Sequence, residues 1–185
     1  MTTAATPTLL TWTIDGAHTE AGFAVKHLMI STVRGRFGDV KGTVSFDPAN
    51  LATGSADVTI DVASIDTREA QRDAHLRSAD FFETEKFPTL TFKSRRVENL
   101  KGDAFHLVGD LTIKDVTREV ALDVESHGLQ KDPWGGERAG FSAKTVINRK
   151  DYGLVWNVAL ETGGIVVGDE VKITLDVELI KTPQA

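Results

Sequence analysis

The segment Val171–Leu179 constrains the fold more than any other part of the chain, because apolar and polar residues alternate strictly along it. Val171 and every second residue after it, up to Leu179, are apolar, and charged or hydroxyl side chains stand between them. Successive side chains of a β-strand point to opposite faces of the sheet. This period of two therefore predicts a strand with one apolar face and one solvated face.

The same period recurs along the chain. It is clear in three further segments: Ala56 to Val62, Phe105 to Ile113, and Val116 to Val124. Weaker candidates are Thr11 to Ile14, Glu20 to Leu28, Phe37 to Phe46, Thr89 to Arg95, and Gly140 to Ile147. Turn-forming residues separate several of these segments. The pattern predicts an all-β fold in which about eight antiparallel strands close into a barrel wide enough to hold a ligand.

One segment departs from the strand pattern. Over residues 67–78, Ala70, Ala74 and Arg77 fall at helical spacing, and Asp66 with Glu69 resembles a capping box at the start of the segment. Pro88 limits how far a helix can extend. We expect a short helical crossover that lies near one mouth of the barrel.

Composition narrows the class of protein. A chain of 185 residues with 41% hydrophobic and 26% charged residues is typical of one globular domain. The formal net charge of −6 argues against a nucleic-acid partner, which requires clustered Lys and Arg. The absence of cysteine excludes disulfides, thiolate metal sites and a cysteine nucleophile.

Several motifs, in order and spacing, resemble the YceI-like family. They are Trp12-Thr-Ile-Asp15, Phe23-Ala-Val-Lys-His27, Gly35-Arg-Phe37, Ser64-Ile-Asp-Thr67, Arg72-Asp73-Ala-His75, Phe81-Phe82, Phe87-Pro88, Gly109-Asp-Leu111-Thr-Ile-Lys114, and Ile147-Asn-Arg149 with Tyr152-Gly153. The resemblance spans most of the chain. It implies a lipocalin-like barrel that binds polyisoprenoid or similar long apolar chains.

From the resemblance we expect a noncatalytic protein that holds an isoprenoid-type lipid, a polyprenyl chain or a quinone-like molecule, for sequestration, transport or storage. Burial of each methylene favours such binding by about 0.8 kcal/mol. We expect no cofactor, no metal and no catalytic residue. The candidate ligand-binding residues are Trp12, Phe23, Val25, His27, Val58, Ile60, Phe81, Phe82, Phe92, Leu107, Arg149 and Trp156.

Three polar positions admit two interpretations each. His27 shares the inward register of Phe23 and either donates to a ligand head group or is a hydrogen-bonded core histidine. Arg149 either pairs with a phosphate or carboxylate head, or is a structural arginine tied to Asp151 or a backbone carbonyl. Arg118 falls at a strand position in phase with inward-facing residues. A bulge that shifts the register, or a place at the solvated rim of the barrel, would explain a charged side chain there.

The cluster of Arg72, Asp73 and His75 on the helical segment is expected to anchor the crossover rather than to touch a ligand. No short metal-ligand spacing involves the five histidines. A zinc site would therefore have to assemble from distant strands.

Two rival functions stay open at the level of sequence. One is an enzyme acting on an isoprenoid or quinone lipid, with His27 as general acid or base. The other is an interaction domain with a solid core, because a hollow and a packed barrel both need apolar side chains that point inward. A homodimer is compatible with either.

The start of the chain, residues 1–13, has no basic region and no long apolar run. We therefore expect no secretory signal and a cytoplasmic location, although many members of the resembled family are periplasmic. No later segment is apolar enough to predict a membrane span.

Overall fold

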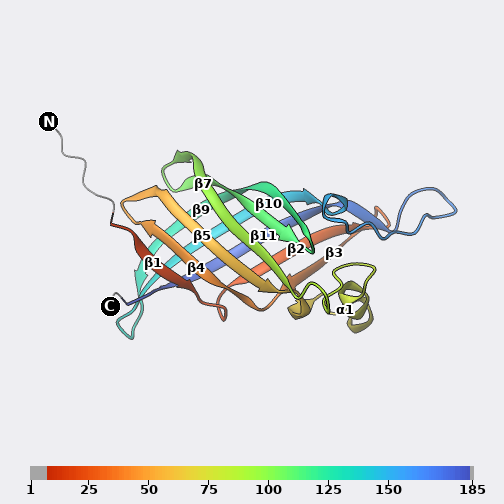
Figure 1. The fold of residues 1–185 in the computed structure, drawn as a ribbon, viewed down its shortest axis with the longest axis horizontal. Coiled ribbons are helices and arrows are strands. Elements are labelled where there is room, and N and C mark those ends of the chain that lie inside the picture. The colour runs from red at the N-terminus through yellow and green to blue at the C-terminus, as the bar shows by residue number, and fades with distance from the viewer. Residues whose placement is uncertain (1–7, 184–185) are drawn as a thin grey trace.

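The computed structural model describes residues 8–183. Residues 1–7, which belong to the stretch where no secretory signal is expected, lie outside the described residues. The described chain forms an 11-stranded antiparallel sheet that closes on itself, with one short α-helix at one end (Figure 1). The predicted all-β antiparallel barrel is confirmed. No helix within residues 8–183 is long and apolar enough to cross a membrane.

Eight strands form the closed ring. In the order in which they pair they are β1 (Leu10–Ile14), β4 (Val40–Asp47), β5 (Asn50–Asp61), β7 (Thr89–Lys101), β8 (Ala104–Ile113), β9 (Val116–Lys131), β10 (Glu137–Asn148) and β11 (Val167–Lys181). The ring closes at β1, where Trp12 lies opposite Val44 of β4 and Lys181 of β11.

Three further strands extend the wall at the other end of the barrel. The first part of β11 pairs with β2 (Glu20–His27), β2 pairs with β3 (Ser31–Phe37), and β3 pairs with β6 (Ile65–Asp66). The last residues of β11 thus pair with β1 and close the ring. The earlier residues of β11 pair with β2, and β3 and β6 extend the sheet from there.

The prediction of one strand from Phe37 to Phe46 is wrong. Phe37 ends β3 and Val40 begins β4, and Gly38 and Asp39 form the turn between them. Both turn residues donate their backbone N–H groups to the Ser64 hydroxyl oxygen, at 3.1 and 3.2 Å. This long-range contact holds the turn, and the local alternation of residues gives no sign of it.

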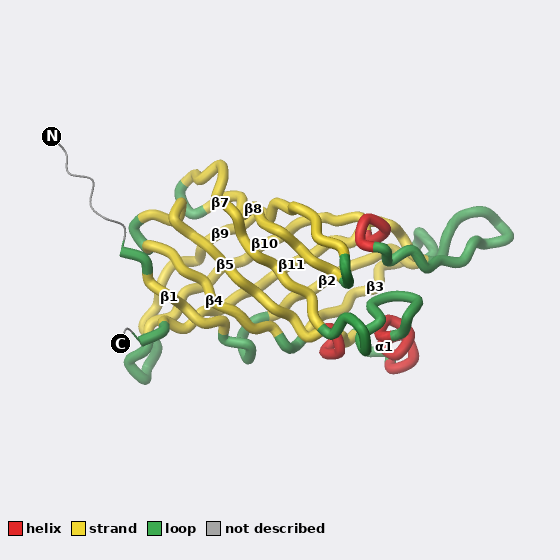
Figure 2. Tube along the Cα trace, viewed as in Figure 1, coloured by secondary structure: helices red, strands yellow, loops and turns green. Residues whose placement is uncertain are grey.

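The helical crossover is confirmed, with a shorter helix than predicted. Helix α1 spans Ala70–Arg77, and the Glu69 carboxylate caps it by accepting hydrogen bonds from the N–H groups of the first turn. Two short 3₁₀ segments, η1 (Val62–Ser64) and η2 (Arg149–Tyr152), were not predicted. All three helical segments lie at the same end of the barrel (Figure 2).

Candidate ligand-binding cavity

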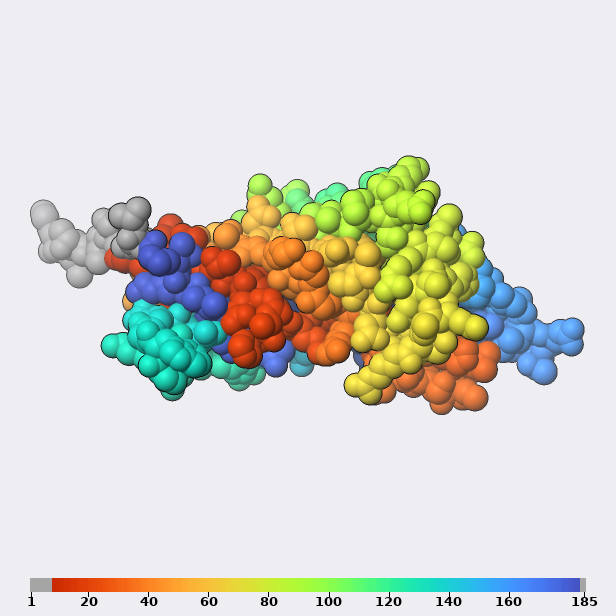
Figure 3. Space-filling model, turned by 90° about the horizontal axis from the view of Figure 1, so that it is seen from below, coloured from red at the N-terminus to blue at the C-terminus, as the bar shows by residue number. Residues whose placement is uncertain are grey.

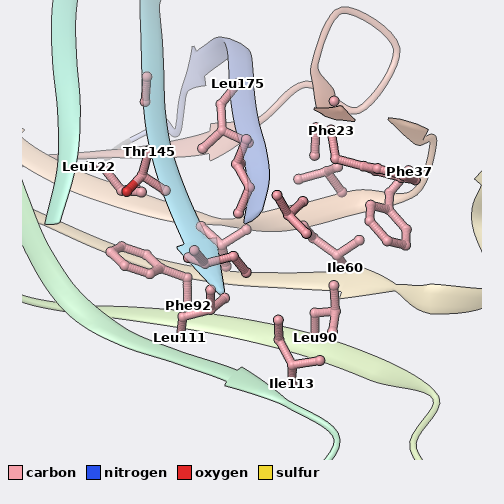
Figure 4. Close-up of a pocket in the computed structure, with 18 of the residues that line it drawn as sticks. Phe23, Phe37, Ile60, Leu90, Phe92, Leu111, Ile113, Leu122, Thr145 and Leu175 are labelled. Atoms are coloured by element: carbon pink, nitrogen blue, oxygen red, sulfur yellow. The ribbon is translucent and has the colours of Figure 1, made fainter. Parts of the chain in front are cut away.

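The interior of the barrel is hollow. It contains a cavity of about 700 Å³. The apolar residues of β11, from Val171 to Leu179, all line it, as their alternation predicts. Strands from opposite sides of the ring send Phe92, Leu122 and Leu175 towards the same space (Figure 4). The solid-core alternative therefore does not describe this barrel.

The lining is mostly apolar, and its basic side chains gather at the end that carries α1. They are Lys26 and His27 at the end of β2, Arg72 and His75 in α1, and Arg149 in η2. The lining also includes an acidic residue, Glu20, at the start of β2. Of the polar residues deeper along the wall, Thr145 is shown in Figure 4. We call the α1 end the mouth of the cavity.

Eleven of the twelve candidate residues line this cavity, and Trp12 does not. Trp12 is fully buried and stacks on Phe46, with ring centroids 5.3 Å apart. Phe46 in turn meets the edge of Phe141 at 5.5 Å. Phe46 and Phe141 line the cavity, so Trp12 lies behind them and packs the end opposite the mouth.

An aromatic contact joins the crossover to the loop that follows η2. The ring of His75 meets Trp156 edge-on at 4.7 Å and Phe81 at 5.1 Å, and Phe81 lies 5.4 Å from Trp156. The structure thus brings Phe81 and Trp156 into contact at the mouth, and His75 contacts both. His75 also hydrogen-bonds to Asp80 at 2.8 Å.

A second aromatic row runs from the wall to the crossover. Phe23 of β2 lies 5.6 Å from Phe37 of β3, which meets Phe82 edge-on at 5.9 Å. Gly35 makes room for this row, because a Cβ there would lie only 2.4 Å from the Phe23 ring and 2.8 Å from the Thr67 methyl. The glycine of the Gly35-Arg-Phe37 motif is explained by this close approach.

The polar residues of α1 anchor the crossover, as the sequence indicates. The buried Asp73 carboxylate accepts hydrogen bonds from the backbone N–H of Thr67, at 2.9 Å, and from its hydroxyl. Arg72 donates to the Thr67 hydroxyl at 2.7 Å and to the Thr67 carbonyl at 2.8 Å. This network holds α1 beside the mouth.

His27 lies at the mouth, at the last position of β2. It pairs with Ser31 of β3 and with Val167 of β11, its side chain is half-buried, and it lines the cavity. Within residues 8–183 its imidazole makes no hydrogen bond, and only its backbone carbonyl accepts them, from Ile30 and Ser31. Its ring nitrogens are therefore available to a bound molecule.

Arg149 is committed to the backbone around it. Its side chain is 3% exposed and donates to the carbonyls of Gly168 at 2.8 Å, Trp156 at 2.9 Å, Val167 at 3.3 Å and Leu154. Burial lowers the pKa of Arg149, which Asp169 partly offsets. Since a guanidinium has five N–H donors, little donor capacity is left for a ligand head group. Among the alternatives raised by the sequence, the arginine tied to backbone carbonyls describes this residue.

Arg118 lies on the solvated rim. The pairing of β8 with β9 runs without a register shift, so a bulge does not explain its phase. Its exposed guanidinium donates to the Asp151 carbonyl at 2.8 Å.

One group of side chains has the spacing of metal ligands, on the outside of the seam between β1 and β11. Asp15, His18 and Glu178 offer ligand atoms within 4.8 Å of one another. Arg138 already donates to both carboxylates, at 2.8 Å to Asp15. The hydrogen bonds from His18 and Arg138 hold the pKa of Asp15 below its usual range, against the opposing effect of burial. The arginine supplies the positive charge that a metal ion would bring.

The fold and the cavity together define a hollow antiparallel β-barrel of the lipocalin type, closed at one end and lined by apolar side chains. Residues 12–179 match the YceI-like domain family. The chain therefore belongs to the YceI-like family.

Relatives and solved structures agree with this assignment. A UPF0312 protein of Staphylococcus aureus strain N315 is 42% identical over 168 residues, which cover 90% of this chain and 95% of the relative. A YceI protein of Campylobacter jejuni superposes with a TM-score of 0.74 at 34% identity, over 85% of this chain and 90% of that chain. A polyisoprenoid-binding domain from Saccharophagus degradans has the same fold, with a TM-score of 0.72 at 16% identity over 94% and 99% of the two chains.

Proposed function

We propose that this protein is a noncatalytic carrier that holds one isoprenoid-type lipid, with the tail in the barrel and the head group at the mouth beside His27. The observation that carries the proposal is the cavity of about 700 Å³, mostly apolar along its length and with basic side chains at the mouth. Membership of the YceI-like family supports it, and so does the fold shared with a polyisoprenoid-binding domain.

The size of the cavity bounds the tail. A methylene is close in size to a water molecule, whose share of liquid volume is about 30 Å³. A cavity of about 700 Å³ therefore accommodates on the order of 23 such groups. This corresponds to about four or five isoprene units inside the barrel, and the rest of a longer chain would extend from the mouth.

Native mass spectrometry of freshly purified protein, followed by organic extraction, tests the proposal. We expect a bound isoprenoid or quinone at one molecule per chain, or the uptake of one geranylgeraniol, a 20-carbon polyprenyl alcohol, by the unloaded protein. An unloaded mass that stays unchanged after incubation with geranylgeraniol would contradict the proposal. Turnover of the bound lipid that depends on His27 would instead favour the enzymatic alternative.

His27 is expected to distinguish head groups and to contribute little to tail affinity. In the variant His27→Ala, the preference for geranylgeraniol over the corresponding hydrocarbon without a hydroxyl should fall by up to about tenfold, since one hydrogen bond contributes about 0.5–1.5 kcal/mol. Titration of both ligands by competition with a fluorescent lipid measures this ratio.

The variant His27→Gln is the matched control, because its amide keeps a donor and an acceptor at the mouth. It should retain most of the preference. An equal loss of affinity for both ligands in His27→Ala would show that His27 has a structural role in the barrel and does not bind the head group.

A further inference from the structure

Large apolar side chains are exposed on two protruding segments beside the mouth. Met29 and Ile30 belong to the turn between β2 and β3 and are 59% and 83% exposed. Val155 and Val158 belong to the loop between η2 and β11 and are 61% and 47% exposed. We call these four residues the mouth rim. In Figure 3 the loop, coloured blue, projects beyond the crossover, coloured yellow.

The two segments are joined directly. The N–H of Leu28 donates to the carbonyl of Val166 at 2.9 Å, and His27 pairs with Val167. The two segments that carry the mouth rim therefore lie side by side next to the cavity.

The loop is a built structure with apolar side chains on both of its faces. Leu154 and Trp156 line the cavity, whereas Val155 between them faces outwards. The Asn157 side chain holds the base of the loop, since its amide nitrogen donates to the Val167 carbonyl at 2.7 Å and its oxygen accepts from Val166 and Val167. Exposed apolar surface beside a binding cavity is typical of a site that contacts a protein or a membrane.

The turn between β2 and β3 supports the same interpretation. Leu28 and Met29 both adopt positive φ, at 50° and 60°, and the N–H of Ile30 donates to the His27 carbonyl. Two consecutive positions of positive φ in a hairpin turn favour Asn-Gly, because bulky side chains are strained there. Leu28 and Met29 occupy these positions although they destabilise the turn. Their presence places apolar side chains at the tip of the hairpin.

Charge is scarce on both segments. Residues 28–32 carry no ionisable side chain and residues 153–168 carry only Glu161, in a chain of which 26% is charged. An uncharged, protruding apolar surface suits insertion among lipids whose head groups have no net charge. It does not suit electrostatic attraction to an anionic membrane, which requires clustered Lys and Arg.

We propose that the mouth rim is a docking surface for a neutral phospholipid bilayer. This inference rests on the proposed function, because a lipid that passes between bilayer and barrel exposes its methylenes to water unless the mouth meets the membrane. Docking through the rim would place the cavity entrance against the source of the ligand.

Co-flotation with phosphatidylcholine vesicles tests the proposal, with two variants of matched exposure. Ile30 and Trp134 are both 83% exposed. Trp134 lies in the turn between β9 and β10, at the end of the barrel away from α1 (Figure 1). We expect Ile30→Glu to lower the vesicle partition coefficient at least tenfold and Trp134→Glu to change it less than twofold. Binding of the unaltered protein should persist in 0.5 M salt, because apolar contact is not screened.

Three results would overturn the docking surface: equal partition of the two variants, vesicle binding that is lost in high salt, or a dimer of the unaltered protein that Ile30→Glu dissociates in sedimentation velocity. The last would make the rim an interface between copies of this chain.

Geranylgeraniol supplied from detergent micelles separates this proposal from the proposed function. Ile30→Glu should take up the lipid from micelles with unchanged affinity, while its transfer from phosphatidylcholine vesicles slows at least tenfold. If the unaltered protein binds vesicles through Ile30 but takes up no lipid from micelles, the docking surface stands and the carrier function falls.

Discussion

Replacing Val58 with phenylalanine should weaken the binding of geranylgeraniol by roughly 100-fold and leave the melting temperature almost unchanged. Val58 lines the cavity from the middle of β5. Phenylalanine has about four more carbon atoms than valine and would displace about four methylenes of the ligand, at about 0.8 kcal/mol each. The new ring enters empty space, so the usual cost of overpacking a filled core does not arise.

Thr59→Phe is the matched control for Val58→Phe. Thr59 is the next residue of β5 and is exposed on the outer face, so the same aromatic ring enters at the same height of the barrel but outside it. Its lipid affinity should equal that of the unaltered protein. Competition binding measures the affinities and thermal unfolding measures the stabilities. If binding and stability fall together in Val58→Phe, the ring is not entering a cavity.

Replacing Arg149 with leucine should lower the free energy of unfolding by about 3–5 kcal/mol, a loss typical of breaking a buried charged network. The substitution leaves the carbonyls of Leu154, Trp156, Val167 and Gly168 without the donor that ties η2 and the following loop to β11. For a chain of this size the melting temperature should fall by roughly 10 °C. Urea unfolding measures the free energy.

Two further arginine variants sharpen this experiment. Arg149→Lys should rescue little, because one ammonium group cannot reproduce the fork of a guanidinium. Arg118→Leu removes an exposed arginine that donates to a single carbonyl, and it should cost less than about 1 kcal/mol. A different result would assign Arg149 a head-group role. In that case Arg149→Leu would keep the free energy of unfolding of the unaltered protein, and it would lose more affinity for geranylgeranyl phosphate than for geranylgeraniol.

The sequence predicts the faces of the strands well. The alternation from Val171 to Leu179 reflects a physical requirement, since each second residue of β11 meets the interior and the others meet water. The prediction of one continuous strand at Phe37–Phe46 is wrong, because Gly38 and Asp39 form a turn that is held by hydrogen bonds to Ser64. Such long-range contacts leave no period in the local sequence.

The sequence does not show whether the barrel is hollow, because inward apolar side chains are needed in either case. The cavity exists because the ring is wide and because Trp12 and Phe46 pack at one end and leave the remaining length unfilled. For the same reason Trp12 cannot be distinguished from a lining aromatic such as Phe92 by residue type. The partners of Arg149 are also hidden, since they are backbone carbonyls and every residue has one.

Both ends of the described chain lie at the closed end of the barrel. Strand β1 begins and β11 finishes there, away from α1, and the N–H of Thr182 donates to the carbonyl of Thr11 at 2.9 Å (Figure 1). A tether, a label or a fused domain joined at either terminus therefore leaves the entrance unobstructed. A surface-immobilised protein attached in this way presents its mouth to the solution, in the orientation that lipid-transfer measurements require.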